Sequence, residues 1–286
     1  MSAGAILADA ARRLGAVSDT PRLDAELLLA HALGIERNAL LLGLRDVMVP
    51  EAFEPLVARR LAHEPIAYIT GTRAFWTIEL AVSPAVLIPR PDSETLIEAA
   101  VAHFGRAGPR RLLDLGTGSG ALLLAALAQW PDATGVGVDA SAAAVAVARV
   151  NAERLGLGDR ATIVAGGWDA AAGGEYDLIL CNPPYIAADD PLPPDVVRYE
   201  PSSALFAGAD GLDDYRAIAP LLRLPPGGIA CIEIGASQAT AVTALFAGHN
   251  FATRVVQDLA GRDRCVIVVP NCNSPWNSSR DLLHEG

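Results

Sequence analysis

Residues 114–120 read Asp-Leu-Gly-Thr-Gly-Ser-Gly and join two segments of different pattern. The mostly apolar run Arg111–Leu115 predicts a buried strand, and the apolar run Ala121–Gln129 predicts a helix. Glycine permits the tight turn that this junction needs, and it lets a ligand approach the backbone closely. The spacing satisfies the pattern G-x-G-x-x-A, which is typical of nucleotide-binding folds. The stretch therefore predicts a ligand-binding loop between a strand and a helix.

Asp139 supports the same interpretation. It ends the next predicted strand, 139 − 120 = 19 residues after Gly120, where a carboxylate can accept hydrogen bonds from ribose hydroxyls. A purely structural glycine turn is the weaker alternative, because strand, loop, helix and acid follow one another in order. These features predict a cofactor that contains a nucleoside, but they do not choose between NAD and S-adenosyl-L-methionine.

Strand and helix patterns alternate from Arg111 onward, which predicts an α/β doubly wound fold with a mostly parallel sheet. The expected strands are Arg111–Leu115, Gly135–Asp139, Ala161–Ala165, Tyr176–Cys181, Gly228–Glu233, Phe251–Gln257 and Arg264–Val269. The expected helices of this region are Ala121–Gln129, Ala142–Arg154, Asp213–Leu222 and Ser237–Ala247. No long helix separates the last two strands, so we expect them to pair antiparallel.

A second motif, Asn182-Pro183-Pro184-Tyr185, follows the predicted strand Tyr176–Cys181. Proline lacks the N–H that a sheet ladder needs, so the chain must leave the sheet at the C-terminal end of this strand. Open α/β sheets bind ligands at that edge. The turn would present an amide, a free carbonyl and an aromatic ring, and two such acceptors suit a planar NH2 group. Taken alone, the motif fits a structural Pro-Pro turn equally well.

The two motifs together favour one class of chemistry. In the expected strand order the first and fourth strands are neighbours, so the glycine loop and the Asn182 turn would face one cleft. This combination resembles the amino-methyltransferases, which use S-adenosyl-L-methionine on a planar NH2 group. A nicotinamide enzyme has no use for this turn, and no His or Lys is placed here for hydride chemistry.

The composition restricts the expected partners. The net charge is -11, no basic run occurs, and all 22 basic residues are Arg, so we expect no direct nucleic-acid partner. The four cysteines lack metal-ligand spacing, so no metal is expected. No signal sequence or apolar run of membrane-spanning length is present. We therefore expect a cytoplasmic protein without a membrane partner.

The sequence divides into four expected regions. The N-terminal region carries helical patterns, including a helix that starts at Thr20-Pro21 and ends at Gly34, and it contains no cluster of chemical groups. Between Tyr68 and Leu87 the period changes to two: Trp76, Ile78, Leu80 and Val82 alternate with polar or small residues, which predicts a hairpin. The expected boundaries are a helical substrate-recognition domain at 1–75, a β-hairpin linker at 76–90, a catalytic domain at 91–270 and a disordered tail at 271–286.

Nearly the whole chain resembles the PrmC/HemK family, the peptide chain release factor N5-glutamine methyltransferases. Besides the two motifs, the resemblance rests on Glu64–Gly71, Ile88–Glu94, Glu200-Pro201, Gly211–Asp213 and Asp258–Arg264. Asn-Pro-Pro-Tyr alone is shared with adenine methyltransferases, whereas the helical N-terminal domain and the Asp258–Arg264 segment are more specific. The resemblance implies a class I S-adenosyl-L-methionine-dependent methyltransferase fold, Rossmann-like with a mostly parallel seven-stranded sheet, and a small N-terminal helical domain.

The resemblance also implies methylation of the GGQ-motif glutamine of release factors, with a role for each matched residue. The implied cofactor-binding residues are Gly116, Thr117, Gly118, Ser119, Gly120, Asp139, Trp168 and Asn182. The implied substrate-binding residues are Asn182, Pro183, Pro184 and Tyr185, of which Asn182, Pro183 and Tyr185 are also the expected catalytic residues. One departure is visible: the family commonly has Asp before the tryptophan, whereas Gly167 stands there and Asp169 follows.

Three alternatives stay open at this point. An adenine-N6 nucleic-acid methyltransferase shares the Asn182 turn but needs a basic groove. An NAD-dependent oxidoreductase shares the glycine loop. A non-catalytic binding protein can retain the fold, although an intact Asn182 turn and glycine loop argue against it.

Overall fold

The computed structural model describes residues 2–171 and 173–271. They form two compact units: the helical unit comprises residues up to Thr72 together with Val82–Pro84 and Leu192–Glu200, and the sheet unit comprises the other described residues. Apart from Asn271, the expected tail lies outside the described residues, as does Cys272. No helix within the described ranges combines the length and apolar character needed to cross a membrane.

The helical unit is built from short helices. They are α1 (Ala3–Leu14), α2 (Pro21–Leu33), α3 (Arg37–Gly43), α4 (Phe53–Leu61), α5 (Ile66–Thr70) and α9 (Pro194–Tyr199). As predicted, α2 begins at Pro21, and it ends at Gly34, whose φ of 67° is a left-handed conformation that glycine adopts without strain. Leu7, Leu28 and Phe53 are buried in its core, which satisfies the apolar faces of α1, α2 and α4.

A buried ion pair crosses this unit. Arg60 Nε donates to Asp24 Oδ2 at 2.9 Å, and Arg60 Nη2 donates to the Val17 carbonyl at 3.1 Å, so the buried guanidinium is hydrogen-bonded.

Helix α9 comes from much later in the chain and was not predicted. Its Tyr199 hydroxyl donates to the Ala62 carbonyl at 3.0 Å. The segment that follows the Asn182 turn therefore returns to the helical unit.

A two-stranded sheet occupies the region of the expected hairpin. Its strands are β1 (Thr72–Phe75) and β2 (Ile78–Ala81), so the first strand lies before residue 76. Trp76 was expected in the alternating strand pattern, but it stands in the turn with a φ of 54°. Its backbone N–H donates to Glu94 Oε1 at 2.9 Å and its indole N–H donates to Gln129 Oε1 at 3.3 Å. These bonds hold a residue type that rarely adopts this conformation.

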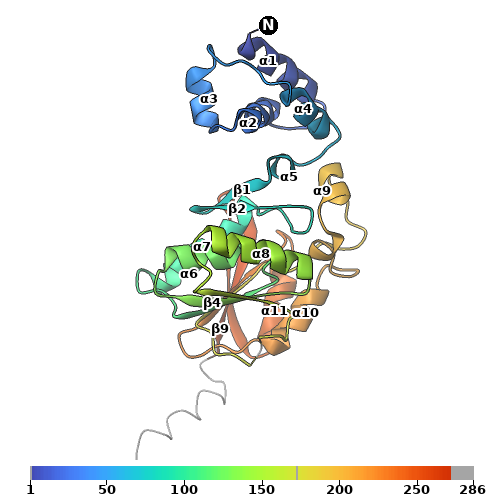
Figure 1. Ribbon diagram of the computed structural model, residues 1–286. Coiled ribbons are helices and arrows are strands. Elements are labelled where there is room, and N and C mark those ends of the chain that lie inside the picture. The colour runs from blue at the N-terminus through green and yellow to red at the C-terminus, as the bar shows by residue number, and fades with distance from the viewer. Residues whose placement is uncertain (1, 172, 272–286) are drawn as a thin grey trace, which may run out of the picture. The chain divides into compact units, whose positions relative to one another are not determined.

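The main sheet confirms the predicted mostly parallel, seven-stranded architecture (Figure 1). Its strands are β3 (Arg111–Leu115), β4 (Thr134–Asp139), β5 (Ala161–Ala165), β6 (Leu178–Cys181), β7 (Ile229–Glu233), β8 (Phe251–Gln257) and β9 (Asp263–Pro270). Their order is β5-β4-β3-β6-β7-β9-β8, and β9 runs antiparallel to both of its neighbours. The expected antiparallel pairing of the last two strands is therefore confirmed.

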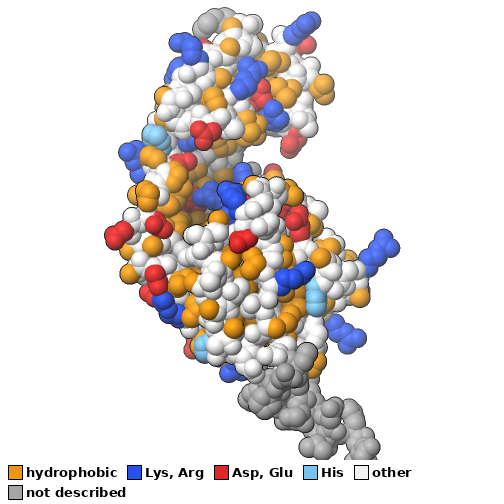
Figure 2. Space-filling model, turned by 180° about the vertical axis from the view of Figure 1, so that it is seen from behind, with side chains coloured by type: hydrophobic (Ala, Val, Ile, Leu, Met, Phe, Trp, Pro, Cys, Tyr) orange, Lys and Arg blue, Asp and Glu red, His pale blue; other side chains and the backbone are white. Residues whose placement is uncertain are grey.

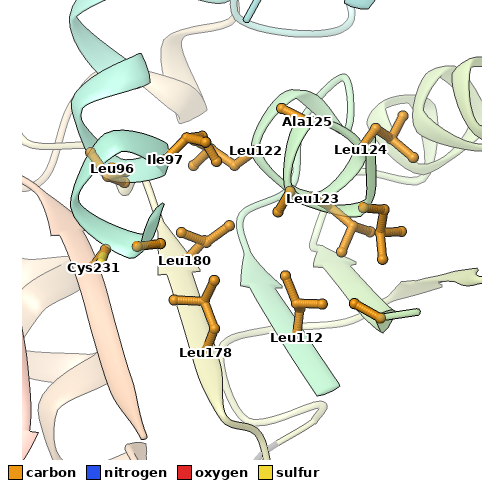
Figure 3. Packing of buried hydrophobic residues seen from close by; sticks show 14 of the residues in the cluster. Leu96, Ile97, Leu112, Leu122, Leu123, Leu124, Ala125, Leu178, Leu180 and Cys231 are labelled. Carbon is orange, nitrogen blue, oxygen red and sulfur yellow. The ribbon is translucent and has the colours of Figure 1, made fainter. Parts of the chain in front are cut away.

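Helices cover both faces of this sheet. Helices α6 (Glu94–Phe104), α7 (Ala121–Gln129) and α8 (Ala142–Arg154) pack on one face, and α10 (Asp213–Ile218) and α11 (Ala239–Gly248) pack on the other. Successive residues of β3 alternate between the two cores, Leu112 on the first and Leu113 on the second. Figure 3 shows Leu96, Ile97 and Leu122 of α6 and α7 packed over β3 and β6.

Helix α10 is shorter than the expected Asp213–Leu222. It ends at Ile218 and continues as a 3-10 turn, η3 (Ala219–Leu221). Pro220 explains the change, because proline lacks the N–H that an α-helix needs. Two further 3-10 turns, η1 (Pro91–Ser93) and η2 (Ser202–Ala204), flank the site described below.

The register between β3 and β6 sets the position of the site. The two strands are parallel neighbours, and Leu115 is paired with Cys181. Gly116 and Asn182 are the next residues of the two strands, so they leave the sheet side by side at its C-terminal edge. The expected neighbourhood of the first and fourth strands is thus confirmed.

We predict that Gly135→Ala destabilises the fold. A Cβ at this position of β4 would lie 2.5 Å from Leu123 Cδ1 and 3.3 Å from Leu112 Cβ, so α7 would have to shift. Overpacking of this kind costs about 1–3 kcal/mol of unfolding free energy. The control is Gly248→Ala, where an added Cβ meets no described atom within 4 Å. Urea denaturation of both variants is the measurement, and equal midpoints would contradict the close packing of α7 on β4.

Candidate active site

A cavity of about 310 Å³ opens at the C-terminal edge of the sheet, and all its lining residues belong to the sheet unit. The loops that follow β3, β4, β5 and β6 supply part of its wall. The rest comes from the segment 85–90, from η1 and η2, and from residues of β1, β4, α7, α8 and α10. Its volume suits a small-molecule ligand. Of the predicted cofactor residues, those that line it are Gly116, Thr117, Gly118, Ser119, Asp139, Trp168 and Asn182.

The glycine loop depends on left-handed backbone at three positions. Gly116, Gly118 and Gly120 have φ values of 71°, 55° and 84°, which side chains disfavour. A Cβ on Gly116 would lie 3.2 Å from the Trp168 ring, and a Cβ on Gly120 would lie 2.9 Å from Leu124 Cδ1. Gly118 is different, because a Cβ there would meet only one atom, at 4.0 Å. The backbone at Gly118 is therefore open to a ligand.

Asp139, the last residue of β4, is hydrogen-bonded to the backbone of this loop. Its Oδ2 accepts from the Gly118 N–H and its Oδ1 accepts from the Ser141 N–H, both at 2.8 Å. Each carboxylate oxygen retains a second lone pair. Because Asp139 also lines the cavity, it can accept two further hydrogen bonds from the hydroxyls of a ribose.

Trp168 lies at the cavity wall, partly packed into the second sheet core. Its indole N–H donates at 3.0 Å to Asp214 Oδ1 of α10, and Asp214 also lines the cavity. Burial raises the pKa of Asp214, and the bond from Trp168 opposes that rise. Gly167 lines the cavity without a side chain, whereas the exposed Asp169 is not among the lining residues. Sequence reasoning missed Asp214, the acid that contacts the tryptophan.

The Asn182 turn divides into cavity-lining and buried parts. Asn182 and Pro184 line the cavity, whereas Pro183 is buried and Tyr185 does not line it. Asn182 Nδ2 donates to Ser93 Oγ at 3.1 Å. This bond directs the nitrogen of the amide toward η1 and leaves Oδ1 as the acceptor that can serve a ligand.

Tyr185 is held at both its side chain and its backbone. Its hydroxyl donates to Glu233 Oε1 at 3.2 Å, and its carbonyl accepts from Gln238 Nε2 at 2.9 Å. A Cβ on Gly211 would lie only 2.3 Å from the same carbonyl, so the turn needs glycine there. Burial raises the pKa of the Tyr185 phenol, which therefore stays protonated.

Two buried carboxyl groups lie behind the motifs. Asp114 Oδ2 accepts from Thr117 Oγ1 at 2.6 Å and from the Leu123 N–H at 3.2 Å, which ties the glycine loop to α7. Glu233 ends β7 and is hydrogen-bonded by Ser93 and Tyr185. Burial raises the pKa of each carboxyl to about 7.

An ion-pair clasp connects two segments that the sequence singled out. Asp92 Oδ2 lies 3.0 Å from Arg262 Nη2 and 3.3 Å from Arg264 Nη2, and Arg262 Nε also binds Asp258 Oδ2 at 3.0 Å. The clasp joins Ile88–Glu94 to Asp258–Arg264 across 170 residues of chain. It holds η1, and thus Ser93, beside the Asn182 turn.

Arg90 is the one arginine among the residues that line the cavity, and Asp139 and Asp214 are the acids there. S-adenosyl-L-methionine carries a carboxylate, an ammonium, a sulfonium, a ribose and an adenine. One cation, two acids, an open glycine backbone and a partly buried tryptophan match that set of groups.

Known proteins extend these observations. Two family models match, PrmC N-terminal domain over residues 5–71 and Methyltransferase small domain over residues 92–194. A release factor glutamine methyltransferase of Rhodospirillum rubrum is 46% identical over 258 residues, which cover 87% of this chain and 79% of the relative. One of Cereibacter sphaeroides is 44% identical over 273 residues, which cover 93% and 97%. The chain belongs to the release factor glutamine methyltransferases.

Two solved structures are also similar to this chain. The release factor-specific protein-(glutamine-N5) methyltransferase of Alicyclobacillus acidocaldarius is 31% identical, with a TM-score of 0.40 over 66% of this chain and 98% of that one. The hMettl16 catalytic domain reaches a TM-score of 0.51 at 16% identity over 68% and 76%, which reflects the fold alone. Membership in the release factor glutamine methyltransferases confirms the predicted family, class of enzyme and methyl donor.

We predict that S-adenosyl-L-methionine binds and that NAD does not. Asp139→Ala should weaken the binding of S-adenosyl-L-methionine by about 1–3 kcal/mol, because this is the range for losing hydrogen bonds to a charged acceptor. Isothermal calorimetry measures both ligands. Asp159→Ala, at an exposed acid of the same unit, is the control and should bind normally. An unchanged affinity of Asp139→Ala would remove Asp139 from the site.

We predict that stability falls as pH rises from about 5 to about 7. Over this range an unfolded chain has lost the protons of Asp114 and Glu233, whereas the folded chain still holds them, so deprotonation penalises folding by on the order of 3 kcal/mol per group at most. Asp114→Asn and Glu233→Gln should each flatten the dependence, and the exposed Glu153→Gln should not. Urea denaturation at several pH values measures the free energy of unfolding. If the variant that combines Asp114→Asn and Glu233→Gln loses as much stability between pH 5 and pH 7 as the wild type, these two carboxyls are not the cause.

Proposed function

We propose that this protein transfers a methyl group from S-adenosyl-L-methionine to the side-chain amide nitrogen, N5, of a glutamine in peptide chain release factors. One observation carries the proposal: Gly116 and Asn182 emerge side by side from β3 and β6 onto one cavity. A cofactor loop and an amide-binding turn thereby meet at the same place. Membership in the release factor glutamine methyltransferases supports the substrate.

The cofactor is held by the lining residues of the sheet unit. Asp139 would accept from the ribose hydroxyls, and Trp168 would pack on the adenine. The open backbone at Gly118 would hold the methionine portion, and Arg90 would pair with its carboxylate. When bound, the cofactor supplies a methyl group on a positively charged sulfur, which is already a strong electrophile.

The protein's own task is to position a weak nucleophile. An amide nitrogen is poorly nucleophilic because its lone pair is delocalised into the carbonyl. Asn182 Oδ1 and the Pro183 carbonyl accept the two N–H bonds of the substrate amide, and Tyr185 packs against its plane. These acceptors orient the nitrogen and stabilise the positive charge that develops on it. Proton loss can follow methyl transfer, so the reaction needs no strong general base.

The helical unit recognises the protein substrate. It forms its own core and, within its described residues, contributes no side chain to the cavity. This separation supports the division into a helical recognition domain of about residues 1–75 and a catalytic domain of about 91–270. Recognition by protein surface is also in keeping with the charge of -11, and acidic and basic side chains are interspersed on the face seen in Figure 2.

Two finer assignments belong to the same proposal. We infer no direct nucleic-acid partner, which separates this protein from an adenine-N6 methyltransferase, because a groove for phosphates needs a concentration of positive charge. We also place the reaction in the cytoplasm, and the free, buried thiols of Cys181, Cys231 and Cys265 support a reducing compartment.

We predict that Asn182→Ala lowers the rate of methyl transfer by about 10²–10³, the cost of losing one preorganised polar contact. Asn182→Asp should also methylate poorly while it still binds cofactor, because a negative charge beside the sulfonium stabilises the ground state and the amide NH2 that bonds Ser93 is lost. Single-turnover transfer to purified release factor measures both. Asp189→Ala, at an exposed position of the same loop, should react normally. Wild-type rates in both Asn182 variants would mean that the turn is structural.

A further inference from the structure

Glu233 has no role in the reaction as proposed, yet it lies directly behind the substrate turn. It ends β7 and is 1% exposed. Its Oε1 accepts from the Tyr185 hydroxyl at 3.2 Å, its carboxyl is also hydrogen-bonded by Ser93, and its Oε2 has no hydrogen-bond partner among the described residues. A carboxyl group buried in this way is costly to the fold, which argues for a role at the site.

When Glu233 is ionised, the hydrogen bonds from Glu233 to Asn182 have only one consistent direction. An ionised carboxylate can accept but cannot donate, so the single O–H of Ser93 must point to Glu233. The Ser93 oxygen is then left as an acceptor, and Asn182 Nδ2 donates to it at 3.1 Å. Burial raises the pKa of Glu233 to about 7, while the Ser93 and Tyr185 hydroxyls and the positive charge of Arg264 oppose that rise, so the carboxyl is ionised, as this direction requires, above about pH 7.

The direction of this chain of bonds decides which end of the Asn182 amide faces the cavity. With Nδ2 committed to Ser93, Oδ1 is the atom left to accept from a substrate N–H. A reversed amide would present an NH2 group to the substrate NH2, and two donors cannot bond each other. The same carboxyl also fixes the Tyr185 hydroxyl and thereby the ring beside the substrate amide.

We propose that Glu233 and Ser93 are positioning residues for methyl transfer, which orient the Asn182 amide so that its oxygen receives the substrate amide. The proposal rests on the proposed role of Asn182 and extends it to Ser93, which lines the cavity, and to Glu233, which does not. The clasp of Asp92 with Arg262 and Arg264 holds Ser93 in place for this purpose.

The test compares Ser93→Ala, Ser93→Thr and Glu233→Gln in single-turnover methyl transfer with saturating cofactor and release factor. Ser93→Ala and Glu233→Gln should each lower the rate by about 10², because a misplaced contact at the reacting centre costs this much. Ser93→Thr retains the hydroxyl and should restore the rate. Cofactor affinity by calorimetry and the KM for release factor should stay unchanged in Glu233→Gln, which does not line the cavity, and in Ser93→Thr, which retains the hydroxyl. Ser237→Ala and Glu153→Gln, both exposed, are the controls.

A double variant separates a shared role from two independent defects. If Glu233 acts through Ser93, then Glu233→Gln should cost almost nothing further in the Ser93→Ala background. Wild-type rates in Ser93→Ala and Glu233→Gln, or fully multiplicative losses in the double variant, would overturn the proposal. If Ser93→Ala does not fold, Glu233→Gln and Ser93→Thr carry the comparison.

Asn182→Ala distinguishes the two levels of the account. A slow Asn182→Ala with fast Ser93→Ala and Glu233→Gln would refute the positioning role and leave the proposed function intact. A fast Asn182→Ala would refute the proposed role of the turn itself, and the positioning role would fall with it.

Discussion

The parallel register of β3 and β6 is the constraint on which the site depends. Because Leu115 pairs with Cys181, the next residue of each strand emerges at the same height and on the same edge. A Cβ on Gly116 would lie 3.9 Å from the Asn182 carbonyl oxygen, so the two loops are almost in contact. A shift of register by one residue would place the wrong side chains on that edge. The distance between the glycine loop and the Asn182 turn is therefore set by backbone hydrogen bonds of the sheet.

Buried polar groups behind the C-terminal edge of the sheet orient the two loops. Asp114 ties the glycine loop to α7, and Glu233 ties the substrate turn to Ser93 and Tyr185. Both carboxyls are almost fully buried, and burial raises their pKa values, so each costs stability at neutral pH. Natural active sites commonly carry such destabilising groups where they improve the geometry of the reaction.

The fold was predictable because its signals are local. Apolar runs, glycine spacing and proline breaks specified the seven strands of the main sheet, and the pairing of the first and fourth strands followed from the known topology of such sheets. The glycine loop, Asp139 and Asn182, which line the cavity, were found for the same reason, whereas Trp168 came from the family resemblance. Helix α9 was missed because it is short and because none of its residues is buried, so it leaves no apolar period in the sequence. Trp76 was misplaced because tertiary hydrogen bonds overrode its strand preference.

Ser93, Asp214 and Glu233 were missed for a different reason. Each is a single polar residue on an element far along the chain from the motif that it supports, and only the folded sheet brings them together. Glu233 carried a usable signal, since it follows an apolar strand and ends at the same edge as Asp139. The Ile88–Glu94 and Asp258–Arg264 segments were recognised without a physical role, and the clasp between them supplies it.

The most direct measurement of the central claim is mass-spectrometric mapping of the methyl group. The enzyme is incubated with isotope-labelled S-adenosyl-L-methionine and purified release factor, and the digested product is fragmented. The account predicts one added methyl group on the side-chain nitrogen of a single glutamine, which disappears when that glutamine is replaced. A methyl group on another type of residue, or transfer only to nucleic acid in a parallel reaction, would contradict it.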